Sequence, residues 1–181
     1  IIKWEKEFLK HGKENQEKIL SEIKDGKVVH VDETSVKVNT DLHWIHTISN
    51  ERGIFYTVTK KRCDRETGPL DKLASFNNVL VHDHLKSYYT LENCQHAECN
   101  AHIQRYLQEG IDFEDSEACG KVLEILQMSL HRKLELQRKV YGRMAEEEVS
   151  AISGMMQTVM SEEIRRYSEE HPDIKKRYEA S

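Results

Sequence analysis

The sequence has no long hydrophobic run and little cysteine. No stretch approaches the ~18 consecutive apolar residues that a membrane-spanning helix needs, and the chain does not open with the charged and apolar segments of a signal peptide. We therefore expect a cytoplasmic protein. The cysteines form no dense framework, which predicts reduced thiols rather than a disulfide scaffold. They are Cys63, Cys94, Cys99 and Cys119.

An excess of positive charge is also missing. Lysine and arginine number 27 against 32 acidic residues, a formal net charge of -5. Because strong non-specific DNA binders tend to be basic, this net charge excludes electrostatic binding of nucleic acid by the whole protein surface. Any DNA contact has to be local, or made by segments outside this sequence. With 38% apolar and 33% charged residues, the 181-residue chain predicts one globular domain with a helical appendage.

The first third of the chain predicts a helix followed by an antiparallel meander. Residues 1–24 have the apolar spacing of an amphipathic helix, which Asp25-Gly26 ends. Turn residues at 40–41 and 50–53 then separate short β-rich runs. The runs are 27–33, 35–39, 42–49 and 53–60.

The rest predicts a crossover, a buried strand and helices. Residues 61–76 contain a short helical pattern, and the apolar run in 77–83 is typical of a strand buried on both faces. This order predicts an α/β sheet whose central strands carry Asp32 and Asp83. From about residue 99 the pattern is helical, with a first helix ending at Gly110 and two more within 115–145 and 146–170.

Asp32 and Asp83 each place a charge at the end of an apolar run, in "VVHVDET" and "VLVHDH". On neighbouring strands about 4.8 Å apart, both carboxylates can reach one spot. Their repulsion is relieved by a cation, and Mg²⁺ prefers such oxygen ligands. The alternative is that both aspartates only cap turns, where aspartate is common.

A second group of polar residues follows, in "CQHAECNAH". Cys94, His96, Cys99 and His102 have ligand types that suit zinc, but their spacing matches no common finger, so we favour packing against the catalytic strands. Around Asp83, the side chains of His82, His84 and Lys86 either position phosphate or line a polar loop.

Three motifs in this order resemble a known family. "HVDET.VKVN..LHWIH", "VLVHDHLKSYY" and "C.HAECNAHIQRYLQE" are similar to the catalytic region of the insertion-sequence-66 family of bacterial DDE transposases. The resemblance implies an RNase H-like mixed sheet, an antiparallel meander plus parallel strands, with an α-helical insertion. It also implies cutting and joining of transposon-end and target DNA with Mg²⁺, or Mn²⁺ as a substitute, and a homodimer of the full-length enzyme.

The resemblance also assigns residues. Asp32 matches the first catalytic, metal-binding aspartate and Asp83 the second. Cys99 and His102 match a Cys-x-x-His element that lies near the active site and the DNA, and we add the neighbouring cations Lys86 and Arg105 as DNA contacts. The implied division is a leading helix (1–26), the first part of the catalytic core (27–112) and the helical insertion (113–181).

One family element is not found. The third acid is a glutamate in an Asn-x-x-Ala-Glu-Arg-like context, and "MAEEEV" (144–149) lacks its Asn and Arg. We therefore expect the central piece of a transposase, inactive alone. Another RNase H-like nuclease, with a third acid close to residue 110, is one alternative; a non-catalytic remnant or helical interaction module, which predicts no metal affinity, is another. The acids near residue 110 are Glu109, Asp112, Glu114, Asp115 and Glu117.

Overall fold

The computed structural model describes residues 2–62, 66–139 and 142–171. The chain forms two compact units, Ile1–His102 and Ile103–Ser181, which we describe separately. Within the described ranges, no helix combines the length and apolar character that crossing a membrane requires. Cys63 lies outside those ranges, and the cysteines at 94, 99 and 119 are free thiols.

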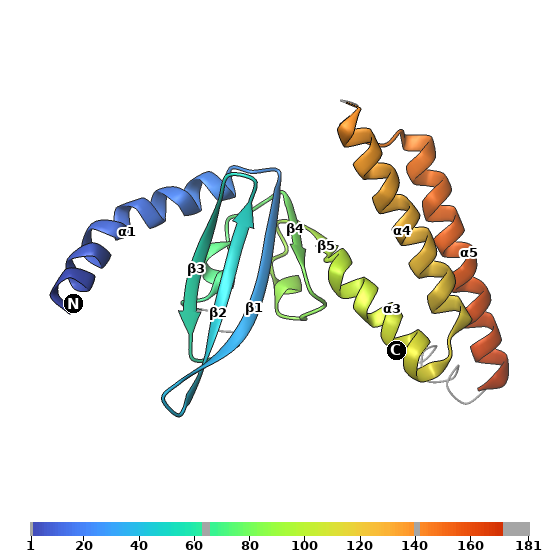
Figure 1. The fold of residues 1–181 in the computed structure, drawn as a ribbon, viewed down its shortest axis with the longest axis horizontal. Coiled ribbons are helices and arrows are strands. Elements are labelled where there is room, and N and C mark those ends of the chain that lie inside the picture. Colours follow the sequence, from blue (N-terminus) through green and yellow to red (C-terminus); the bar gives the residue numbers. More distant parts are fainter. Residues whose placement is uncertain (1, 63–65, 140–141, 172–181) are drawn as a thin grey trace. The chain divides into compact units, whose positions relative to one another are not determined.

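The first unit is built on a five-stranded sheet in the order β3-β2-β1-β4-β5 (Figure 1). β1, β2 and β3 form an antiparallel meander, while β4 pairs parallel to β1 and β5 parallel to β4. This mixed sheet confirms the predicted α/β class and is consistent with an RNase H-like fold. The strands are β1 (Val28–Val38), β2 (Asp41–Asn50), β3 (Gly53–Thr59), β4 (Val79–His82) and β5 (Gln95–Glu98).

Three details of the sheet differ from the prediction. The runs 27–33 and 35–39 are one strand, because β1 pairs with β2 without interruption from His30 to Val38. β4 is fully buried on one face only, by Leu80 and His82, and its other face is half-buried. β5 was not predicted at all, because "QHAE" has no strand-like apolar pattern.

Helix α1 (Ile2–Lys24) is confirmed, and it ends against the sheet. Ile23 is fully buried, and the Asn50 side chain donates a hydrogen bond to its carbonyl, 3.0 Å away. A Cβ on Gly26 would lie only 2.4 Å from Asn50 Nδ2. Glycine is therefore needed here so that the turn after α1 can approach β2 closely.

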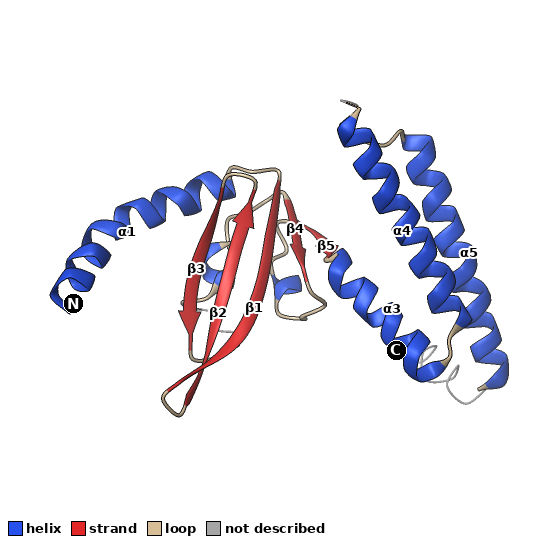
Figure 2. Ribbon diagram, viewed as in Figure 1, coloured by secondary structure: helices blue, strands red, loops and turns tan. Residues whose placement is uncertain are grey.

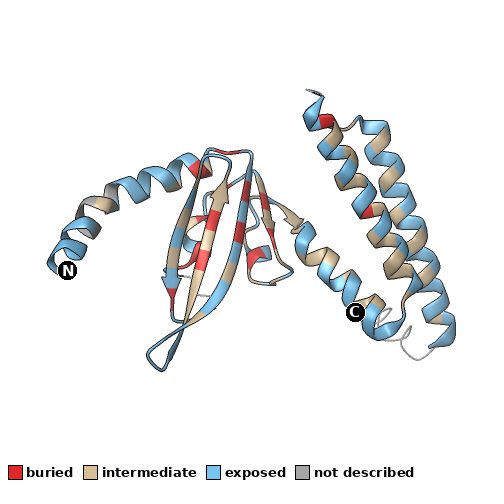
Figure 3. Cartoon of the chain, in the orientation of Figure 1, coloured by how far each residue is buried: buried red, intermediate tan, exposed pale blue. Residues whose placement is uncertain are grey.

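A single hydrophobic cluster fills the first unit (Figure 3). It joins the odd-numbered face of β1 to the short helix α2 (Pro69–Lys72), the chain that follows α2, and the 3₁₀ turn η1 (Tyr88–Thr90). The even-numbered residues of β1 face away from it, and all but the half-buried Val36 are exposed. The cluster comprises Ile23, Val29, Val31, Ile48, Leu70, Leu73, Phe76, Leu80 and Tyr88.

The remaining helices are α3 (Asn100–Glu114), α4 (Glu117–Arg138) and α5 (Glu146–Glu170), and α4 and α5 pack as a hairpin (Figure 2). The helices predicted within 115–145 and 146–170 are thus confirmed. The predicted end at Gly110 is wrong, because α3 continues to Glu114. Ser116 caps α4 by accepting a hydrogen bond from the Cys119 backbone. The division at residues 26 and 112 stays a prediction.

Candidate metal and phosphoryl-transfer site

The parallel pairing of β1 with β4 determines where the two aspartates lie. Val28 pairs with Val79 and His30 with Val81, so two residues further along each chain come Asp32 and Asp83. Asp32 lies on the exposed face of β1, and Asp83 immediately follows the last residue of β4. The two residues that the sequence singled out thus come from adjacent strands of the sheet, at corresponding positions.

Both aspartates also make a local hydrogen bond. Asp32 Oδ1 accepts from the Glu33 backbone at 2.9 Å, and Asp83 Oδ1 accepts from the Leu85 backbone at 3.1 Å. Such bonds are what the turn-capping interpretation predicts. Each such bond takes one lone pair of one oxygen, so both carboxylates retain lone pairs that can bind a metal ion.

The structure adds a buried carboxylate and an arginine that the sequence did not indicate. Arg62 donates from Nε to Glu33 Oε1 at 2.8 Å and from Nη2 to Asp83 Oδ2 at 3.2 Å. The Glu33 side chain is 0% exposed, that of Asp83 11% and that of Arg62 43%. The guanidinium also lies 5.2 Å from the centre of the Trp44 ring, within the range of a cation–π contact. Arg62 therefore joins the strand of Asp32 to the residue that follows β4.

Tyr88 completes this network. Its hydroxyl donates to Glu33 Oε2 at 2.7 Å, and the side chain is buried in the hydrophobic cluster. Burial raises the pKa of Tyr88 far above its ordinary value, and the charges of Glu33, Asp83 and Asp32 raise it further. The phenol therefore remains a proton donor at all physiological pH values. Three carboxylates act on one hydroxyl, so the region carries a negative potential that favours a cation.

The His82 ring contacts the backbone of Asp83. The ring is fully buried, and burial lowers its pKa, so it is neutral at pH 7. Nδ1 donates to the Asp83 carbonyl, which leaves Nε2 to accept from His96 Nδ1 at 2.9 Å. The Cys99 backbone donates to the carbonyl of His82 at 2.8 Å. β5 and the start of α3 thereby support the end of β4.

The four Cys and His residues of "CQHAECNAH" lie next to the contacts of His82 with His96 and Cys99. Cys94 Sγ lies 3.8 Å from His96 Nε2, and the His102 backbone donates to the carbonyl of Cys99. His96 packs on β4 through His82, in line with the packing interpretation. Among the described residues, no three His, Cys, Asp or Glu side chains are grouped as ligands of one metal ion.

The predicted DNA-contacting residues lie on two segments. Lys86 is exposed in the loop after Asp83, whereas Cys99 immediately precedes α3 and His102 and Arg105 lie in its first turns. His84, in the same loop as Lys86, is paired with Glu98, which also accepts from Tyr89 at 2.7 Å. Whether any of them contacts DNA stays a prediction, as does a third acid among residues 109–117.

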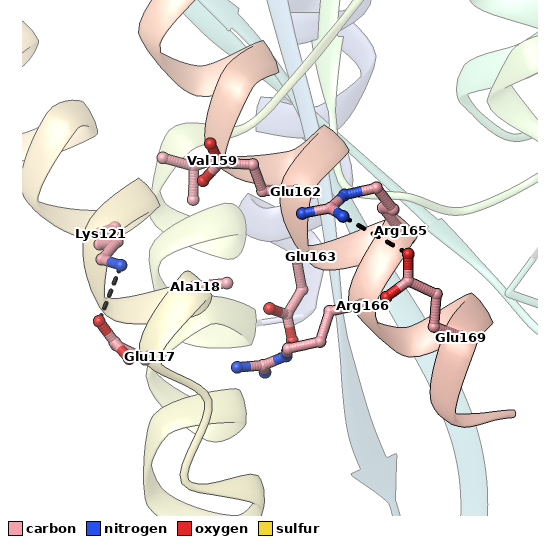
Figure 4. A pocket seen from close by; sticks show the side chains of 9 residues that line it. All are labelled: Glu117, Ala118, Lys121, Val159, Glu162, Glu163, Arg165, Arg166 and Glu169. Atoms are coloured by element: carbon pink, nitrogen blue, oxygen red, sulfur yellow. Dashed lines mark hydrogen bonds and ion pairs between the residues drawn. The ribbon is translucent and has the colours of Figure 1, made fainter.

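The charged groove between α4 and α5 is a different kind of surface (Figure 4). Lys121 pairs with Glu117 at 2.7 Å, and Arg165 with Glu169 at 3.4 Å, each four residues apart on one helix. Such exposed pairs are ordinary helix-surface contacts. Glu117, one of the acids near residue 110, is among the described residues that line this groove, whereas Asp32 and Asp83 are not.

Comparison with known proteins agrees with the motifs. The family model described as transposase IS66 family matches residues 1–179, nearly the whole chain. No curated protein and no solved structure gives a significant match.

Proposed function

The chain belongs to the transposase IS66 family, and from that premise we propose that Asp32 and Asp83 hold a divalent cation, Mg²⁺ or Mn²⁺, for cleaving and joining phosphodiester bonds at transposon ends. The observation that carries the proposal is the parallel register of β1 and β4, since Asp32 on β1 and Asp83 just after β4 each follow the paired residues His30 and Val81 by two positions. The substrates are the transposon-end and target DNA, and the working assembly is a homodimer of the full-length enzyme.

The donor set fits such an ion. Asp32 and Asp83 supply hard oxygen ligands, and the guanidinium 3.2 Å from Asp83 already marks a place where positive charge is stable. Two carboxylates leave ligand positions for water, substrate phosphates and a third acidic side chain from elsewhere in the enzyme. When bound, the divalent ions lower the pKa of the attacking water or 3′-hydroxyl and stabilise the leaving oxygen.

The surrounding residues hold this pair in place. His82 fixes the carbonyl of Asp83, and Tyr88 holds the buried Glu33 carboxylate beside it. Lys86 and Arg105 contribute positive charge for DNA phosphates, and Cys99 and His102 are further DNA contacts, as the family resemblance implies. Because the whole chain carries a net charge of -5, we expect its DNA contacts to be confined to this local positive charge.

Calorimetric titration with Mn²⁺ tests the proposal. We expect the parent chain to bind Mn²⁺, and Asp32→Asn and Asp83→Asn each to weaken binding at least about tenfold, because each removes a charged ligand. Asp71→Asn is the matched control, since Asp71 pairs with Lys72 at 2.9 Å outside the site. Circular dichroism confirms that each variant is folded. Equal affinity in all four proteins contradicts the proposal, and no binding in the parent favours the non-catalytic remnant.

A further inference from the structure

Asp83 already has a positive partner in the protein itself. Arg62 Nη2 donates to its Oδ2 oxygen, while Nε of the same guanidinium is held by Glu33. A guanidinium at this distance repels a divalent ion that approaches the same carboxylate, so metal binding there is favoured when the contact with Arg62 is loosened. The two cations therefore compete for one carboxylate.

We propose that Arg62 is a built-in counter-ion of Asp83, which an incoming divalent cation displaces, and that Glu33 is the anchor that retains Arg62 afterwards. The inference rests on the proposed metal role of Asp32 and Asp83. It assigns Arg62 and Glu33 as positioning residues that set how readily the site takes up metal.

The contacts of Arg62 with Glu33 and with Asp83 are unequal. The bond to Glu33 is 2.8 Å long and ends on a fully buried carboxylate, whereas the contact with Asp83 is 3.2 Å long. Charge-assisted hydrogen bonds are stronger when short and desolvated. The guanidinium itself is 43% exposed, so water can solvate the nitrogen that leaves Asp83. Breaking the bond between Arg62 and Asp83 is therefore easier than breaking the bond between Arg62 and Glu33.

Glu33 is suited to the role of anchor. Its Oε2 oxygen accepts from Tyr88 and its Oε1 from Arg62, so both oxygens are fixed. Removing Arg62 altogether would leave a buried carboxylate without a counter-charge, which is costly. The contact with the Trp44 ring further stabilises the guanidinium in this position. Arg62 therefore retains its contacts with Glu33 and Trp44 when its bond to Asp83 breaks.

The test is Mn²⁺ calorimetry on the whole chain with Arg62 altered. We expect Arg62→Gln to bind Mn²⁺ about three- to tenfold more tightly than the parent, because the competing cation is gone. A double variant, Glu33→Gln with Arg62→Gln, removes both charges and so avoids an unpaired buried carboxylate; it also binds more tightly than the parent. Arg52→Gln is the control, since Arg52 forms an ion pair with exposed Glu51 at the β2–β3 turn, away from the site.

The outcomes separate the inference from the function on which it rests. Binding in the parent that is unchanged in both Arg62 variants overturns the counter-ion role and leaves the metal site standing. Weaker binding in the variants also overturns it, because Arg62 would then orient Asp83 for the metal. No binding in any protein rejects the metal site itself, and the inference with it.

Tryptophan fluorescence provides a direct view of the displacement. The sequence has two tryptophans, so Trp4→Phe leaves Trp44, under the guanidinium, as the single reporter. We expect Mg²⁺ to change Trp44 emission in this background and to leave it unchanged when Asp83→Asn is added. Calorimetric binding without any change in Trp44 emission would show that Arg62 stays in place, and would overturn the inference.

Discussion

At the scale of single residues, the Tyr88 hydroxyl is the contact whose loss is easiest to isolate. Tyr88→Phe removes its hydrogen bond to the buried Glu33 carboxylate, 2.7 Å away, and changes no other atom. Hydrogen bonds to charged groups contribute about 1.5–3 kcal/mol, so we expect the free energy of unfolding to fall by about that amount. Urea denaturation at pH 7 measures it.

Tyr89 is the matched control for this substitution. Its hydroxyl also donates to a carboxylate at 2.7 Å, that of Glu98, but Tyr89 is exposed and His84 supports the same carboxylate. Tyr89→Phe should cost less than about 1 kcal/mol, as exposed contacts do. Equal losses in the two variants would contradict a special role for the buried Glu33 network.

His82 makes stability depend on pH. Its folded-state pKa is lowered from 6.5 by burial, so the unfolded chain takes up a proton first as the pH falls. The stabilisation is therefore complete above about pH 6.5 and is lost below it. We expect the free energy of unfolding to decline between pH 7 and 5, and the decline to be shallower in His82→Gln. A decline as steep in His82→Gln as in the parent would contradict this role for His82.

The sequence indicated the two aspartates but not their neighbours. Asp32 and Asp83 are recognisable because each ends an apolar run, which is a local feature. Glu33 and Arg62 are 29 residues apart and Glu33 and Tyr88 are 55 apart, and neither pair has a local signature. These contacts arise only when β1, the chain after β3, and η1 meet, so periodicity could not reveal them.

At the scale of elements, the close approach of α4 to α3 depends on Gly110, which lies within α3. A Cβ at this position would lie 2.7 Å from Cys119 Sγ and 3.4 Å from Cys119 Cβ. We expect Gly110→Ala to destabilise the helical unit by about 1–2 kcal/mol through overpacking, although alanine is the better helix former. Urea unfolding followed by circular dichroism at 222 nm measures the change.

The same substitution in a Cys119→Ala background tests that cause. Without Sγ the nearest remaining contact is the 3.4 Å one, so the helix propensity of alanine should dominate. Gly110→Ala is then expected to be neutral or stabilising by up to about 1 kcal/mol. The same destabilisation in both backgrounds would show that the close approach to Cys119 is not the reason for glycine.

Element types were more predictable than their limits. The helices at 2–24, 117–138 and 146–170 follow their apolar spacing. β1 continues through Glu33, Thr34 and Ser35 because β2 supplies partners for the whole length, a tertiary effect that overrides weak local preference. Gly110 resembles a helix end in sequence but serves as the point where α4 approaches α3.

At the scale of the whole molecule, the two units differ in how much apolar surface they bury. Nine of the eleven buried hydrophobic residues in the described ranges belong to the first unit, and only Leu126 and Leu136 to the second. Several apolar side chains of the second unit are more than half exposed: Met128, Leu134, Val149, Met160 and Ile164. Since burial of such side chains is the main source of stability, the helical unit is the weaker one.

Hydrogen exchange followed by mass spectrometry tests this difference. We expect the amides of α4 and α5 to exchange at least about tenfold faster than those of β1 and β4, because local opening exposes little further apolar surface in the hairpin. Dilution is the control, since association through the exposed side chains would slow exchange only at high protein concentration. Equal protection of α4 and β1 at the lowest concentration would contradict the expectation. It would mean that the hairpin draws its stability from contacts other than the two buried leucines.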